Sequence, residues 1–135
     1  MLIRPRFLIL GVSEFLDEAI TKKSSQITTM NSHGCDKMQL NIKVLQQSMR
    51  NIDPSCTLSR STCYFEYFRA GPDEVLKVAQ RGKVDENAYS YDELKSLLEL
   101  CFSESLNSEK REVVAQAQRQ LDEKSLQLSE YMWNS

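Results

Sequence analysis

Between residues 35 and 52, apolar side chains recur at alternating intervals of three and four residues, which is the spacing of one face of an α-helix. Asn31 or Ser32 can cap the start of this helix. Asp53-Pro54 marks its end, because the residue before a proline avoids the helical conformation. A strand would need alternation with a period of two, so this segment is restricted to an amphipathic helix. Its apolar face consists of Cys35, Met38, Ile42, Leu45, Met49 and Ile52.

The same segment carries two further apolar residues away from this face. Leu40 and Val44 are four residues apart and lie on nearly the opposite side of the predicted helix. A helix that is apolar on both sides is usually covered on both sides. The pattern therefore predicts that this helix is central, with neighbours on two faces.

The rest of the chain shows helical periodicity as well, and only four glycines and three prolines interrupt it. Ser13 is a candidate N-cap for a first helix, and Ser90 with Glu93 forms a capping box for a later one. We expect an all-α fold, an irregular bundle of five to six helices. The predicted helices cover residues 13 to about 30, 32–52, 58–69, 72–82, 90–101 and 109 to nearly the end. Phe15, Leu16, Ala19 and Ile20 are expected on one face of the first.

The first twelve residues differ in character from the rest of the chain. Arg4 and Arg6 precede a short apolar run, as in a signal peptide, but no cleavage site of small residues comes after it. We therefore divide the chain into residues 1–12, an N-terminal apolar segment consistent with the remnant of a preceding bundle, and residues 13–135, the helical bundle domain. No stretch approaches the length of a transmembrane segment.

Catalytic and metal-binding chemistry is not expected. The formal net charge of −2 does not favour nucleic acid, and no phosphate-binding glycine loop is present. His33 is the single histidine, and Cys35, Cys56 and Cys63 lack zinc-ligand spacing. We predict no enzyme, no cofactor and no metal site, with reduced, buried cysteines. A cysteine nucleophile beside His33 stays open, because spacing alone does not show which groups meet in the fold.

Several large side chains have two interpretations. The aromatic residues between 64 and 68 either fill a helical core or anchor another chain. The side chains of residues 131–133 point in three directions from a helix, so they cannot all face one core. The basic residues form either a solvated face or a patch for anionic lipid or an acidic partner: Lys22, Lys23, Lys37, Lys43 and Arg50. The candidate partner-contact residues are Phe7, Leu8, Leu10, Leu40, Val44, Tyr67, Tyr131 and Trp133.

Four strings of residues, in order along the chain, resemble the C-terminal region of exocyst component four, the Sec-eight type subunit, in its fungal form. The first is MNSHGCDKMQLNIKVLQQSMRNI, residues 30–52. YFEYFRAGPDEVL lies at 64–76, YSYDELKSLLEL at 89–100 and LSEYMW at 128–133. The resemblance extends from about residue 13 to the end and consists of helix-packing patterns, without a catalytic motif.

The resemblance implies a non-catalytic, cytoplasmic part of a complex that tethers secretory vesicles to the plasma membrane during exocytosis. Its partners would be other exocyst subunits and membrane-associated factors at the secretory site. The chain is short for this family and looks truncated. It ends in Ser135, which does not suit the PDZ-domain binding of animal relatives. The alternative is a free-standing helical adaptor that binds a peptide or an anionic lipid surface.

Overall fold

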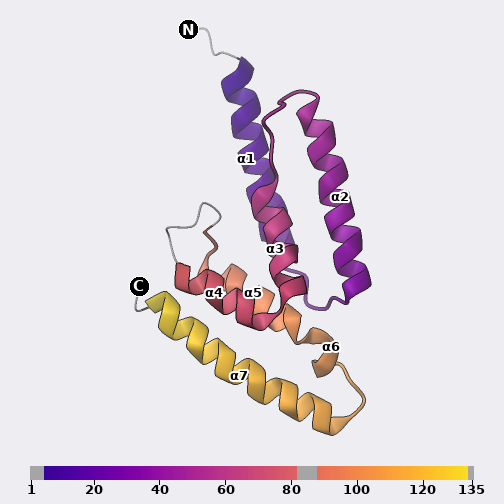
Figure 1. Ribbon diagram of the computed structural model, residues 1–135, viewed down its shortest axis with the longest axis vertical. Helices are drawn as coiled ribbons and strands as arrows, with labels where there is room; N and C mark the ends of the chain where they lie inside the picture. Colours follow the sequence, from indigo (N-terminus) through magenta and orange to yellow (C-terminus); the bar gives the residue numbers. More distant parts are fainter. Residues whose placement is uncertain (1–4, 82–87, 134–135) are drawn as a thin grey trace.

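The computed structural model describes residues 5–81 and 88–133, the first six of them by backbone only, and within these residues the chain is all α-helical (Figure 1). Seven helices are present in this part of the chain. They are α1 (Pro5–Ser24), α2 (Ser32–Arg50), α3 (Ser59–Ala70), α4 (Pro72–Arg81), α5 (Tyr91–Cys101), α6 (Ser103–Leu106) and α7 (Arg111–Trp133). The predicted helical bundle is confirmed. None of the described helices combines the length and apolar content that crossing a bilayer requires.

The central element is α3, which packs against α1 and α2 on one side and against α4 and α5 on the other. In Figure 1, α1 and α2 extend together away from the group formed by α4, α5 and α7. The prediction that α2 is central is wrong. Leu40 and Val44, on its second apolar face, remain 61% and 55% exposed. The short aromatic helix α3 is the central helix instead, since its adjacent residues Tyr64 and Phe65 are both fully buried.

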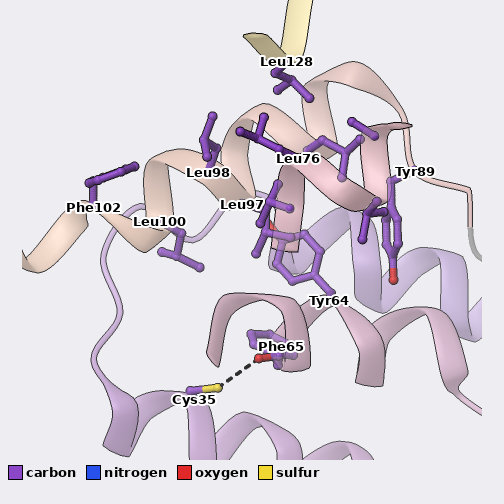
Figure 2. Packing of buried hydrophobic residues seen from close by; sticks show 14 of the residues in the cluster. Cys35, Tyr64, Phe65, Leu76, Tyr89, Leu97, Leu98, Leu100, Phe102 and Leu128 are labelled. Atoms are coloured by element: carbon purple, nitrogen blue, oxygen red, sulfur yellow. Dashed lines mark hydrogen bonds between the residues drawn. The ribbon is translucent and has the colours of Figure 1, made fainter. Parts of the chain in front are cut away.

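Tyr64 and Phe65 join the two parts of the core (Figure 2). Tyr64 reaches toward Leu97 of α5, and Phe65 lies on the side of Cys35 of α2. The two rings meet edge to face with their centroids 5.4 Å apart. Other fully buried side chains come from α4, α5 and α7: Val75, Leu94, Leu97, Leu98 and Leu128. The core is therefore continuous through α3.

Local capping signals place two helix starts as the sequence predicts. Asn31 accepts a hydrogen bond from the backbone N–H of Gly34 at 2.8 Å and caps α2. At α5, the Ser90 hydroxyl accepts from the Glu93 N–H at 3.1 Å, and the Glu93 carboxylate accepts from the Ser90 N–H at 3.0 Å. These caps satisfy backbone groups that have no partner within the helix.

Other boundaries differ from the sequence prediction. Helix α1 begins at Pro5 and runs without a break through residues 12 and 13. Ser13 is therefore a buried residue inside the helix and not its N-cap. The helix ends at Ser24, before the stretch of residues 25–30 into which it was expected to continue. The gap expected between the helices that end at 101 and begin at 109 is partly occupied by the short helix α6.

Candidate protein-protein interface

The buried face of α1 is polar. Ser13, Asp17, Thr21 and Ser24 lie at helical spacing on one side of the helix, and all are buried. This side packs toward α3. Most buried helix faces are apolar, so the polar stripe needs hydrogen-bond partners to be stable.

Asp17 supplies the main connection between α1 and α3. Its Oδ1 accepts hydrogen bonds from the Ser61 N–H at 2.9 Å and the Ser61 hydroxyl at 2.7 Å, and its Oδ2 accepts from the Arg60 N–H at 3.0 Å. Leu58, at the N-cap position of α3, makes no side-chain capping bond. Asp17 therefore caps α3 from a different helix, where a negative charge also suits the helix dipole.

Because the polar stripe faces inward, part of the apolar side of α1 faces solvent. Phe15 is 73% exposed, and Val12 is exposed beside it. Leu16 and Ile20 are only partly buried against the core. Phe15 lies in the same helix as Leu16 and Ile20, as expected, but at the solvent edge of their apolar face. The exposed side chains of Val12 and Phe15 are therefore available for contact with another chain.

An apolar groove continues this surface between α1 and α2. Its hollow has a volume of about 270 Å³. Ala19 and Ile20 line it on the α1 side, Met38 lines it on the α2 side, and Ile27 lies between them. Lys23 and the buried Ser24 are the remaining lining residues. The groove and the exposed part of α1 together form a surface that we call the α1–α2 surface.

The candidate contact residues of α2 and α7 fall on separate surfaces. Leu40 and Val44 are exposed together on the outer face of α2. At the end of α7, Trp133 is 78% exposed, and its ring lies 6.3 Å from that of Tyr91. These two surfaces lie on different parts of the molecule in Figure 1. The candidate contact residues of α2 and α7 therefore face different sides of the molecule.

The remaining candidates are less exposed or outside the described residues. Tyr67 is half-buried, with its ring edge-on to Tyr89 at 6.1 Å. Tyr131 packs partly against the core. The side chains of Phe7, Leu8 and Leu10 lie outside the described residues, and only their helical backbone is described.

The exposed residues Val12, Phe15, Ile52 and Leu126 were missed as candidate contact residues. In α1 the helical spacing of the polar residues was a sequence signal that the apolar side could be exposed. These residues form a polar stripe beside the apolar one: Ser13, Asp17, Thr21 and Ser24. For α7, Leu126 precedes Trp133 by seven residues, so both lie on one face.

Cys35 and Cys56 are buried, and Cys63 and Cys101 are half-buried. The Cys35 thiol donates to the carbonyl oxygen of Phe65 at 3.5 Å, and burial raises its pKa. His33 is exposed on the first turn of α2. Among the described residues, no group of three or more histidine, cysteine, aspartate or glutamate side chains is arranged to hold a metal ion.

Cys101 is expected to react very slowly with alkylating reagents in the native protein. Burial raises the pKa of its thiol from 9.0 to about 12. Only the thiolate reacts, so its reactive fraction near neutral pH is about a thousandfold below that of an ordinary cysteine. Iodoacetamide labelling followed by peptide mass spectrometry measures this, with a urea-unfolded sample as the control. Equal labelling rates in the native and unfolded samples would contradict the raised pKa of Cys101.

Comparison with known proteins finds one extensive similarity. The chain is 35% identical over 166 residues to a probable exocyst complex component sec8 from Neurospora crassa. The match covers 96% of this chain but only 15% of the length of that relative. No protein-family model matches the chain. No solved structure matches it.

Proposed function

The chain is homologous to part of a Sec8-type exocyst component, and on that premise we propose that it works as a non-catalytic helical module in vesicle tethering. It would hold other exocyst subunits through complementary helix surfaces and so help to keep secretory vesicles at the plasma membrane. In this role it would be cytoplasmic and recruited peripherally to the vesicle or plasma membrane. Membrane-associated factors at the secretory site are a second class of partner.

The observation that carries this proposal is the orientation of α1. A helix that buries its polar stripe and exposes Phe15 leaves apolar area in water, which is unfavourable in an isolated protein. Binding another chain would remove that area from water. Large aromatic side chains such as Phe15 and Trp133 are also the types that contribute most to binding energy at interfaces.

Two further surfaces support a module with several contacts. Leu40 and Val44 lie on α2, and Trp133 lies at the end of α7. Residues 13–135, expected as one bundle domain, would therefore present contact surfaces on different sides. Residues 5–12, the first part of α1, would reach toward a neighbouring bundle, with Phe7, Leu8 and Leu10 as further contacts.

The test is affinity purification of the tagged chain from a Neurospora crassa extract, with mass spectrometry of the proteins that co-purify. We expect other exocyst subunits in the wild-type sample. Three variants each change one surface: Phe15→Glu, Leu40→Glu and Trp133→Glu. At least one of them should lower the recovery of the exocyst subunits. Circular dichroism checks that each variant stays folded, as expected for exposed positions.

A tag-only sample is the control for this purification. Recovery of the same proteins with and without the chain would contradict the tethering role. Binding of the chain to anionic vesicles without any exocyst subunit would instead favour the lipid-binding adaptor.

A further inference from the structure

A polar hollow with a volume of about 350 Å³ lies between α1 and the start of α3. Its third side is the segment between α2 and α3, which passes along α1 in Figure 1. We call this site the α1–α3 hollow. Ligand sites in proteins have volumes from roughly 300 Å³ upward, so the hollow has the size of a site for one side chain or another small group.

The lining of the α1–α3 hollow carries an excess of negative charge. Four carboxylates line it: Glu14, Asp17, Glu18 and Asp53. Arg60 is the single basic residue among the described residues of the lining. Its Nη2 donates to Glu93 Oε1 at 2.7 Å, and Glu93 lies outside the lining. The hollow would therefore attract a cation.

Neighbouring basic side chains do not neutralise this charge. Within the described residues, no lysine or arginine forms an ion pair with three of the carboxylates: Glu14, Glu18 and Asp53. Arg50 donates its Nε–H to the backbone carbonyl oxygen of Cys56 instead. Lys22 and Glu18 line an adjacent hollow together without pairing. These three carboxylates are thus available to a ligand.

Two buried side chains of the lining have polar atoms without a hydrogen-bond partner. Asp53 is 7% exposed, and its Oδ1 accepts from the Ser55 N–H and hydroxyl, whereas its Oδ2 has no partner among the described residues. Ser13 is 6% exposed, and its Oγ has none either. Buried polar atoms without a partner are unfavourable and rare in native proteins. A ligand that brings N–H donors into the hollow would satisfy both atoms.

The arrangement of the lining favours a guanidinium group over other cations. The described carboxylates are not grouped as metal ligands. The acceptors lie on separate segments, α1 and the segment before α3, and a guanidinium offers five N–H donors in one plane. It is also more weakly hydrated than an ammonium group, so it is easier to bury. A phospholipid headgroup would bring a phosphate toward the carboxylates, which repel it.

We propose that the α1–α3 hollow binds an arginine side chain of a partner protein. The guanidinium donates to Asp53 Oδ2 and Ser13 Oγ, and it pairs with the exposed carboxylates of Glu14 and Glu18. The arginine belongs to another exocyst subunit, so this inference rests on the proposed function and adds the chemistry of one contact.

Three capped tripeptides test the ligand chemistry, each with glycine on both sides of a central residue. That residue is arginine, lysine or citrulline, the last being a neutral analogue of arginine with nearly the same shape. In a nuclear magnetic resonance titration of the full chain, we expect the arginine peptide to bind with a dissociation constant of about 1 mM. It should shift the amide signals of residues 13–18 and 53–60. The lysine peptide should bind about threefold more weakly, and the citrulline peptide at least about tenfold more weakly.

Three results of this titration overturn the proposal. Binding of the citrulline peptide equal to that of the arginine peptide would show that charge is not recognised. Equal or tighter binding of the lysine peptide would show that the guanidinium is not selected. The absence of shifts in the two named segments would show that the hollow is not the site.

Variants locate the binding in the hollow. Asp53→Asn should weaken the arginine peptide by about tenfold, because it removes the charge while its amide oxygen can still accept from Ser55. The double variant Glu14→Gln with Glu18→Gln should weaken it by about threefold, and it remains measurable if Asp53→Asn does not fold, since both positions are exposed. Glu99→Gln, exposed on α5 outside the lining, is the matched control. Equal effects of the control and the double variant would indicate general charge attraction and overturn the site.

Co-purification separates this inference from the proposed function. Recovery of exocyst subunits should fall in the variant that combines the changes at positions 14, 18 and 53. If subunits co-purify equally with this variant and with wild type, a subunit arginine in the hollow is excluded while the tethering role stands. If the arginine peptide binds in the hollow but no subunit co-purifies, the tethering role fails while the guanidinium site stands.

Discussion

Replacing Phe65 with alanine is expected to lower the free energy of unfolding by about 4 kcal/mol. The Phe65 ring is fully buried in α3 and meets the Tyr64 ring edge to face. Removing the ring reduces the apolar surface that is buried in the core and leaves a cavity. The cavity lies where the helices α1, α2 and α3 pack against α4, α5 and α7. Urea unfolding followed by far-ultraviolet circular dichroism measures the change.

Two other substitutions control this experiment. Phe65→Leu keeps most of the apolar volume and should cost only about 1 kcal/mol, so it remains measurable if the alanine variant does not fold. Phe15→Ala removes the same side chain from an exposed position and should change stability by less than about 0.5 kcal/mol. If Phe65→Ala and Phe15→Ala had similar costs, the central position of α3 would be wrong.

Replacing Asp17 with alanine is expected to cost about 3 kcal/mol, which is large for a single residue of a helix. The substitution leaves the N–H groups of Arg60 and Ser61 and the Ser61 hydroxyl without the carboxylate that accepts their hydrogen bonds. Loss of a helix cap adds to the cost of leaving buried donors unsatisfied. The same urea titration measures this effect.

Asp17→Asn distinguishes the cap from general packing. Asparagine keeps one oxygen that can accept from Ser61, so the expected cost is about half that of alanine. Glu18→Ala, at the neighbouring exposed position, should leave stability within about 0.5 kcal/mol of wild type. A small effect of Asp17→Ala, comparable to that of Glu18→Ala, would show that α1 is not attached to α3 through this carboxylate.

The features predictable from sequence are those that depend on neighbouring residues. The capping box at Ser90 and Glu93 and the apolar seam of α2 from Cys35 to Met49 are local patterns, and both appear in the structure. Ile52, the last residue of the predicted seam, lies beyond the end of α2 and is 62% exposed, so that part of the prediction is wrong. The central role of α3 was not predictable in this way. It depends on Tyr64 and Phe65 finding partners on two different sides, and periodicity within one helix does not contain that information.

Helix α1 shows the same limit for the candidate interface. Its sequence contains an apolar stripe and a polar stripe, and in most surface helices the apolar stripe is the buried one. The polar stripe is buried instead because the first turn of α3 lacks a side-chain cap of its own and takes one from Asp17. Phe15 is therefore exposed although it is not among the predicted contact residues, and the predicted contact residues Leu40, Val44 and Trp133 are exposed as well.

The cap that α1 provides also makes two helices one cooperative unit. If α1 moved away from α3, the backbone amides of Arg60 and Ser61 would lose their acceptor, and the first turn of α3 would fray. The hydrogen exchange rates of these two amides therefore report whether α1 is docked. A partner that pulls on α1 would therefore act on the first turn of α3 through the Asp17 carboxylate as well as through the apolar contacts of Leu16 and Ile20.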